Sequence, residues 1–406
     1  SLLRQKVCLE EYPTNQIRFY NGAKIDLPED RKVYITRDSK GLAERFKQEF
    51  EISGISAAVI SVDGVDAPDL PDAGGLVLLP DAFSTASKNS GAIDFLHAAF
   101  MLIQKNVPYL KKAAEDKGAF LAGVTFLGGG FGFHDRPLEC DPAYGGLAGL
   151  IKTAALEYKT ILCRALDMPG DIDRCLKSAE AAAALMMTHG AVEMGLDGDS
   201  CNIPVLKDLP HPPEPGSILS QDDVVLITGG AKGVTAACGI ELARHFSPTL
   251  VLLGRSPLPG PEPEWAKDIL DPAGLKKAIL VHHFKTSPPK PVELEKVYQQ
   301  IISDRDIREN IARMEESGST VVYYSADIRN PEALSHVIES IKQQHGSITA
   351  LIHGAGIKED KRIADKTLAS FARVIETKIK GFDNLIAELV PDELKYMVLF
   401  SSVAAR

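Results

Sequence analysis

The stretch VVLITGGAKGVTAACGIELARHF, residues 224–246, decides the fold of this chain. Its first four residues, Val224 to Ile227, are all apolar and predict a buried parallel strand. Small residues follow and predict a tight turn into a helix, along which Ala236, Ile240 and Ala243 continue at helical spacing. A buried strand, a glycine-rich turn and a helix in this order are typical of an α/β fold.

The turn in this stretch is suited to binding a phosphate. Small residues let the backbone approach a pyrophosphate, and the N–H groups and dipole of the helix start face the anion. The expected dinucleotide-binding residues are Thr228, Gly229, Gly230, Gly233 and Val234. The stretch departs from the full fingerprint, since Thr235 stands where a third glycine would sit. The alternative is an ordinary strand-turn-helix corner without a ligand.

Length and charge bound the possible functions. The chain has 406 residues, enough for two or three domains, and its apolar content of 45% is ample for large cores. Its formal net charge of -10 argues against non-specific nucleic-acid binding, because phosphate backbones are held by surplus lysine and arginine. An acidic ligand therefore needs a local basic patch.

The cysteines and the apolar runs indicate the compartment. Six scattered cysteines form no C-x-x-C pair and are interpreted as reduced core thiols: Cys8, Cys140, Cys163, Cys175, Cys201 and Cys238. No apolar run approaches the roughly 18 residues of a membrane span, and the first residues lack the apolar core of a signal peptide. We expect a soluble cytoplasmic protein, and the start at Ser1 resembles a cut from something longer.

The first half of the chain alternates strands and helices up to a proline-rich linker, LPHPPEPGS, at Leu209 to Ser217. We place the domain boundary there, between a unit of residues 1–210 and a unit of residues 218–406. The elements expected before the linker are strand 33–36, helix 41–50, strand 55–61, strand 74–80, helix 93–114, strand 119–126, helix 146–158, strand 161–168, helix 172–188 and strand 201–206.

The same pattern repeats beyond the linker. The segments VYITRDSKG at 33–41 and VLITGGAKG at 225–233 share Ile-Thr and then Lys-Gly at identical spacing. We therefore predict an α/β protein with two Rossmann-like, doubly wound parallel-sheet subdomains. The strands expected in the second copy are VVLI at 224, LVLL at 250, VVYY at 321, ALI at 350 and MVLF at 397.

The two copies differ in the turn. In the first copy Arg37, Asp38 and Ser39 replace the glycines and alanine of the second. Side chains then crowd the turn, and a carboxylate sits where a phosphate would need to approach. We predict that the first copy is a structural partner that binds no nucleotide.

A long segment, Pro257 to Ser319, separates the second and third strands of the second copy. It begins with a proline-rich loop and contains a charged helix from about Val292 to Ser317. So many charges favour a solvated helix. A docking surface for a neighbouring domain or carrier is the alternative.

Polar residues follow the next strands of the second copy. Arg255 and Ser256 come after the second strand, where dinucleotide enzymes meet the adenosine ribose, and suit the 2′-phosphate of NADP. The alternative for Arg255 is a surface arginine that caps a loop. Asp327 and Ile328 end the third strand, where a carboxylate and a backbone amide could hold adenine.

Small residues end the fourth strand, at Gly354, Ala355 and Gly356, and permit a close approach of a ligand. They follow His353, a residue type that at such a position is more often a satisfied core histidine than a catalytic base.

Lys378 is the most informative single residue. It lies on the apolar face of the helix expected over 371–389, in line with Phe371, Val374, Ile375, Phe382 and Leu385. A lysine that faces a sheet loses hydration, which is how catalytic lysines arise, although a lysine that extends past the helix edge is the alternative. Ser401 and Ser402 directly follow the fifth strand, at the edge where ligands bind in such sheets.

Together these motifs resemble the short-chain dehydrogenase/reductase family, and specifically the ketoreductase domain of modular polyketide synthases. The resemblance covers almost the whole chain, with TGGAKGVT, GRS, ADIR, HGAG, TKIKG and LFSSVA in fixed order after a degenerate structural half. The turn GGAKGVTA and the insertion with DRDIRENI look most like ketoreductases of polyunsaturated fatty acid and enediyne synthases.

The resemblance implies roles for individual residues. Lys378 matches the catalytic lysine, which also contacts the cofactor, Ser402 the serine that hydrogen-bonds the substrate carbonyl, and Arg255 the NADPH phosphate ligand. Against the Leu-Asp-Asp of ketoreductases that make D products, the chain reads Lys358-Glu359-Asp360, and Asp360 implies a D (3R) product.

The family's catalytic tyrosine and the asparagine after it are expected a dozen or so residues beyond Ser402, whereas the sequence ends at Arg406. We therefore predict that the second subdomain is truncated, that its fifth strand has a sticky edge, and that the 406 residues alone do not reduce a ketone.

The resemblance implies NADPH-dependent reduction of a β-ketoacyl thioester carried by the phosphopantetheine of an acyl carrier protein, beside neighbouring domains of a megasynthase. It implies no metal, nucleic acid or membrane. Two alternatives remain: a non-catalytic domain that scaffolds the synthase or binds carriers, and a free-standing reductase of a small ketone. The large paired structural subdomain argues against the second.

Overall fold

The computed structural model describes residues 5–12, 24–62, 64, 66–83, 91–134, 140–198, 200–209, 219–285 and 289–401. These residues form two compact α/β units. The described residues up to 209 and the segment 359–375 belong to the first unit, and residues 219–358 and 376–401 belong to the second. The segment 359–375 thus packs with the half of the chain that precedes the linker. Most of the predicted linker itself, residues 210–217, lies outside the described residues.

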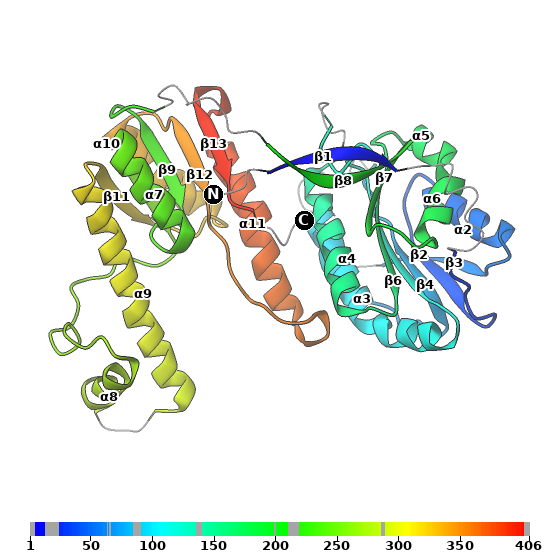
Figure 1. The fold of residues 1–406 in the computed structure, drawn as a ribbon, viewed down its shortest axis with the longest axis horizontal. Coiled ribbons are helices and arrows are strands. Elements are labelled where there is room, and N and C mark those ends of the chain that lie inside the picture. Colours follow the sequence, from blue (N-terminus) through cyan, green and yellow to red (C-terminus); the bar gives the residue numbers. More distant parts are fainter. Residues whose placement is uncertain are drawn as a thin grey trace. The chain divides into compact units, whose positions relative to one another are not determined.

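The first unit is built on an eight-stranded sheet with the strand order β1-β8-β7-β6-β5-β4-β2-β3 (Figure 1). Neighbouring strands from β3 to β7 run parallel, and β8 is antiparallel to both β7 and β1. The strands are β1 (Gln5–Tyr12), β2 (Lys32–Thr36), β3 (Ala57–Ile60), β4 (Ala73–Leu78), β5 (Phe120–Thr125), β6 (Leu162–Asp167), β7 (Glu193–Asp197) and β8 (Ser200–Asp208).

Helices cover this sheet because its central strands are apolar on both sides. Every residue of β4 and β5 is buried, as expected for parallel strands with helices on both faces. The helices of the first unit are α2 (Leu42–Ile52), α3 (Gly91–Asp116), α4 (Gly145–Glu157), α5 (Ile172–Lys177) and α6 (Ala179–Met186).

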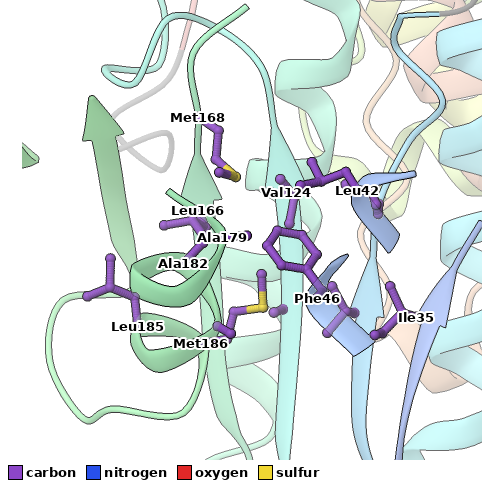
Figure 2. Packing of buried hydrophobic residues seen from close by; sticks show 14 of the residues in the cluster. Ile35, Leu42, Phe46, Val124, Leu166, Met168, Ala179, Ala182, Leu185 and Met186 are labelled. Atoms are coloured by element: carbon purple, nitrogen blue, oxygen red, sulfur yellow. The ribbon is translucent and has the colours of Figure 1, made fainter. Parts of the chain in front are cut away.

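One core of the first unit lies between the sheet and helices α2 and α6. Figure 2 shows Phe46 of α2 beside Val124 of β5, with the side chains of α6 packed on the same face of the sheet. The single helix predicted over 172–188 is wrong. Ser178 separates α5 from α6, with backbone angles of φ -92° and ψ 6° that end one helix and precede the next.

The second unit has a five-stranded parallel sheet in the order β11-β10-β9-β12-β13. The predicted doubly wound α/β class is confirmed, and all five strands expected from the apolar runs are present. The strands are β9 (Val224–Thr228), β10 (Thr249–Gly254), β11 (Thr320–Ser325), β12 (Ala350–His353) and β13 (Tyr396–Leu399).

The helices of the second unit include one that extends well beyond its sheet. Figure 1 shows α9 (Pro291–Glu316) running from the sheet edge beside β11 out to α8 (Pro272–His282). These two helices share a small apolar cluster of their own, centred on Ala266, Leu275 and Ile279. The other helices are α7 (Gly233–Phe246), α10 (Pro331–His345) and α11 (Leu368–Glu388), of which residues 376–388 of α11 belong to this unit.

Strand β13 is the last strand of this sheet among the described residues. Its apolar side chains are unusually exposed, with Met397 at 38%, Val398 at 41% and Leu399 at 51%. The sticky edge that the sequence predicts here stays a prediction. No helix among the described residues is long and apolar enough to cross a membrane.

Candidate functional site: a cleft at the carboxyl ends of the second sheet

A cleft opens in the second unit at the carboxyl ends of β9, β10 and β12, where ligands bind in doubly wound sheets. Three cationic side chains and one carboxylate line it, although the chain as a whole is acidic. The lining residues are Gly229, Ala231, Lys232, Leu253, Gly254, Arg255, Ser256, Ile307, Tyr323, Ala326, Asp327, Ile328, Arg329, Gly354, Ala355, Gly356, Ile357 and Thr377.

The glycine turn between β9 and α7 has the backbone that its sequence predicts. Gly229 and Gly233 adopt positive φ angles of 68° and 62°, which side chains other than glycine rarely tolerate. Lys232 precedes the first turn of α7 without forming a side-chain cap. The helix start therefore offers its N–H groups and dipole to an anion.

Thr235, which replaces the third glycine, is accommodated by a glycine on the neighbouring strand connection. A Cβ at Gly354 would lie 2.4 Å from Thr235 Oγ1. Thr235 is buried against that glycine, so the close packing that the fingerprint obtains with a third glycine is obtained here with Gly354.

Thr228 ties the ends of β9 and β12 together. Its hydroxyl lies 2.9 Å from Nδ1 of His353 and accepts a hydrogen bond from the N–H of Ala355 at 3.2 Å. Burial, with a contribution from the charge of Lys378, lowers the pKa of His353 to about 4, so its ring is neutral at pH 7. His353 is only 4% exposed, as expected for a core histidine, but it is not fully satisfied, since its buried Nε2 has no hydrogen-bond partner among the described residues.

Arg255 and Ser256 extend the cleft beyond β10, and both are exposed. Their carbonyl groups are held by hydroxyl donors from β11: Ser325 donates to Arg255 O at 3.1 Å, and Tyr323 donates to Ser256 O at 2.7 Å. The backbone of this segment is thus fixed while the guanidinium of Arg255 remains at the surface of the cleft.

Asp327 at the end of β11 is already paired. Arg329 donates from Nε at 3.0 Å and from Nη2 at 2.6 Å to the two oxygens of its carboxylate. The hydrogen bond from Arg329 lowers the pKa of Asp327, which stays ionised. The neighbouring Ile328 is 5% exposed and accepts a hydrogen bond at its carbonyl from Asn384.

Lys378 lies beside the cleft, on the part of α11 that belongs to the second unit. Gly356 makes room for it, since a Cβ there would lie 3.0 Å from Lys378 Cε. Its Nζ is 3.5 Å from the carbonyl of Phe400, and burial of the ammonium lowers its pKa. The side chain as a whole is more exposed than its place on the apolar face of α11 predicts.

Other predicted site residues lie elsewhere. Val234 does not line this cleft but faces an apolar groove between α7 and β13, and is 70% exposed. Asp360 belongs to the segment that packs with the first unit, and it is exposed and not among the cleft residues. Ser402 lies outside the described residues.

The contribution of α9 to the cleft differs from the solvated helix that its charges predict. Ile307 lines the cleft and is 3% exposed. It belongs to an apolar row with Ile311 and Met314, at helical spacing of four and three residues, which the surrounding charges obscure. Lys232 and Arg329, two of the three cations in the cleft, were also not identified.

A family model for the KR domain matches residues 223–406, the part of the chain that forms the cleft. The match spans all five strands of the second sheet, so the second unit resembles a KR domain. A KR domain implies a nicotinamide cofactor.

Curated relatives are megasynthases. The chain is 29% identical over 273 residues to a polyunsaturated fatty acid synthase polypeptide of Thraustochytrium sp., matching 64% of this chain and 10% of that protein. It is 27% identical over 189 residues to polyketide synthase PksM of Bacillus subtilis, matching 47% of this chain and 3% of that protein. The chain thus spans a tenth or less of the length of these two relatives.

Solved ketoreductases share the fold across both units. The structure of A-type ketoreductases from a modular polyketide synthase superposes with a TM-score of 0.67 at 18% identity, covering 99% of this chain and 75% of that one. The N-terminal ketoreductase from the macrolactin assembly line gives a TM-score of 0.65 at 17% identity, covering 99% of this chain and 74% of that one.

The residues of the cleft fit a nicotinamide dinucleotide. The glycine turn allows a close backbone approach, the uncapped start of α7 suits a pyrophosphate, and Lys232, Arg255 and Arg329 outnumber the single carboxylate of Asp327. Since Asp327 is neutralised by Arg329, the charge left for an anionic ligand is positive.

Proposed function

We propose that the second unit binds NADPH in this cleft and reduces the ketone of a β-ketoacyl thioester to the β-hydroxyacyl thioester. The observation that carries the proposal is a basic, glycine-walled cleft in an acidic chain, at the carboxyl ends of a parallel sheet in a KR domain. A dinucleotide carries several phosphates, and this cleft provides backbone N–H groups and cations for them.

NADPH is preferred over NADH because of Arg255 and Ser256. They follow β10, where an acidic residue would bind the 2′-hydroxyl of NADH, and the guanidinium can instead donate two hydrogen bonds to the 2′-phosphate. Arg329 is engaged by Asp327, so Arg255 is the cation that remains for the 2′-phosphate at this end of the cleft.

Lys378, which lies beside the cleft, and Ser402 act on the ketone. When bound, the nicotinamide supplies the hydride that adds to the ketone carbon. Ser402 polarises the ketone oxygen, and Lys378, which keeps its ammonium near the ends of β12 and β13, holds the nicotinamide ribose and favours proton delivery to that oxygen. By resemblance the proton donor is a tyrosine, and Asp360 directs formation of the D (3R) alcohol.

The substrate is delivered as a thioester on the phosphopantetheine arm of an acyl carrier protein, with neighbouring synthase domains as further partners. Support comes from the relatives, which carry the names of a polyunsaturated fatty acid synthase and a polyketide synthase. Reduction of an acetoacetyl-pantetheine thioester by the complete gene product, followed by chiral analysis, tests this part. NADPH binding without reduction would favour a non-catalytic domain.

Arg255 provides the test of cofactor choice. We expect Arg255→Ala to weaken NADP⁺ binding about tenfold to a hundredfold, because a charge-assisted hydrogen bond to phosphate is lost, and to leave NAD⁺ binding unchanged. Isothermal titration calorimetry measures both affinities. Arg244→Ala, which removes another exposed arginine from α7, is the matched control. Equal effects of Arg255→Ala on NADP⁺ and NAD⁺, or tighter binding of NAD⁺ by the unmodified chain, would contradict the assignment.

A further inference from the structure

One face of α9 is directed at the glycine turn. Ser303, Ile307, Asn310 and Met314 follow each other at spacings of four, three and four residues, which place them on one side of a helix. Each of them contacts the turn, the cleft or α7, whereas the intervening positions include the exposed Asp306 and Glu309. The face is therefore distinct from the solvated side of the helix.

The apolar part of this face fixes α9 against α7. Met314 is fully buried and lies over Gly239, where a Cβ would be 2.8 Å from Met314 Cε. Ile307 is 3% exposed and belongs to the same core cluster as Ile227 and Ala236 on either side of the turn. The helix therefore has a defined position relative to the turn.

The polar part of the face holds the turn itself. Asn310 donates a hydrogen bond from Nδ2 to the carbonyl oxygen of Ala231 at 3.1 Å, and Lys232 donates from Nζ to Ser303 Oγ at 2.7 Å. A trans peptide points its C=O and N–H in opposite directions. Because the carbonyl of Ala231 is turned toward α9, the N–H of Lys232 is turned away from α9.

The first unit shows why such a contact is needed. There the Asp38 carboxylate of the matching turn accepts hydrogen bonds from the backbone N–H groups of Lys40, Leu42 and Ala43. Ser39 of the same turn donates hydrogen bonds to Asp81. Glycines and alanine replace Arg37, Asp38 and Ser39 in the second turn, which has no side-chain cap. A glycine-rich segment loses more conformational freedom on ordering, so an external contact that orders it in advance favours binding.

We propose that Asn310 is a positioning residue that orients the Ala231–Lys232 peptide, and with it the helix start, toward the pyrophosphate of the dinucleotide. This inference rests on the proposed function of the cleft. It assigns to α9 a role in cofactor binding in addition to its packing.

The test compares two ligands on two variants. NADP⁺ contains the pyrophosphate, whereas adenosine 2′-monophosphate contains the 2′-phosphate without it. We expect Asn310→Leu to weaken NADP⁺ binding about threefold to tenfold, the range for one lost hydrogen bond, and to leave binding of adenosine 2′-monophosphate unchanged. Gln300→Leu, which removes an exposed amide from the same helix, is the matched control and should change neither affinity.

Each other outcome decides a different question. If the NADP⁺ affinity of Asn310→Leu lies within twofold of that of Gln300→Leu, the role of Asn310 is overturned and the proposed function of the cleft is not. Equal weakening of both ligands would also overturn the role of Asn310, since a general distortion of the cleft is then the cause. Failure of the unmodified chain to bind NADP⁺ would overturn the proposed function. If Asn310→Leu does not fold, Asn310→Ser, whose hydroxyl is too short to reach Ala231, carries the same expectation.

Discussion

The two turns of this chain solve one problem in two ways. Each follows a buried parallel strand, and each ends at a glycine with positive φ, 86° at Gly41 and 62° at Gly233. In the first unit the carboxylate of Asp38 accepts hydrogen bonds from three N–H groups at the start of α2, at 2.8, 3.2 and 2.7 Å. In the second unit Gly230 stands at the matching position and has no side chain to do so.

The difference explains how one fold serves two purposes. A helix start needs acceptors for its unpaired N–H groups. In the first unit the carboxylate of Asp38 accepts these hydrogen bonds. It stabilises the turn and occupies the N–H groups that an anion would need. The second leaves those groups for a ligand, and its cleft carries the cations that an anionic ligand needs. If the proposed function holds, a single side chain at the turn separates a structural copy from a binding copy.

Moving the aspartate from one turn to the other gives the largest expected effect. Gly230→Asp should weaken NADP⁺ binding more than a hundredfold, because Asp38 at the matching position of the first turn accepts hydrogen bonds from the helix-start N–H groups that the second turn leaves for a phosphate. Calorimetric titration measures the loss. Gly230→Ala is the control for crowding, since any Cβ there would lie 2.5 Å from Ile227 Cγ2. Equal losses in both variants would show that the carboxylate is not the cause.

Acid should destabilise the second unit through protonation of His353. Its folded-state pKa of about 4 lies below the ordinary value of 6.5, so between these pH values the unfolded state binds a proton that the folded state does not. Stability is thus lost as the pH falls from about 6.5 to 4, by up to about 3 kcal/mol.

The urea midpoint of the second unit, followed by the fluorescence of Trp265, measures this loss. His353→Gln should flatten the pH dependence, whereas His336→Gln, which removes an exposed histidine, should not. An unchanged slope in His353→Gln would exclude His353 as the titrating group.

The smallest expected effect is in the first turn. Asp38→Ala removes three hydrogen bonds at the start of α2 and should destabilise the first unit by about 1–2 kcal/mol, without changing NADP⁺ affinity. Thermal unfolding followed by circular dichroism reports the stability. Asp30→Ala, at a side chain 79% exposed, is the control. A second NADP⁺ binding site in Asp38→Ala would mean that the Asp38 carboxylate alone prevents nucleotide binding at the first turn.

The sequence was sufficient to predict elements that leave a local signal. All five strands of the second sheet coincide with apolar runs, and buried parallel strands produce such runs. Strand β1 produced none, since QKVCLEEY is mostly polar and is stabilised by pairing with β8, where Gln5 faces Asp208. Pairing between residues this far apart in the sequence cannot be read from a local pattern.

The candidate site was likewise predicted where its residues follow the apolar strands, and not where its residues are placed by packing. Eight of the predicted residues line the cleft, because strand ends in a parallel sheet meet at one edge: Gly229, Arg255, Ser256, Asp327, Ile328, Gly354, Ala355 and Gly356. Asn310 was not predicted, since its role depends on where α9 packs, and a charged helix gives little indication of its buried side. The pairing of Asp327 with Arg329 likewise depends on side-chain geometry.

We propose that this chain holds one dinucleotide site, in the second unit. Calorimetric titration of NADP⁺ into the 406 residues tests it most directly, with Gly230→Asp and Asp38→Ala measured alongside. We expect one site per chain, lost in Gly230→Asp and kept in Asp38→Ala. Two sites in the unmodified chain, no site, or a site that persists in Gly230→Asp and disappears in Asp38→Ala would contradict it.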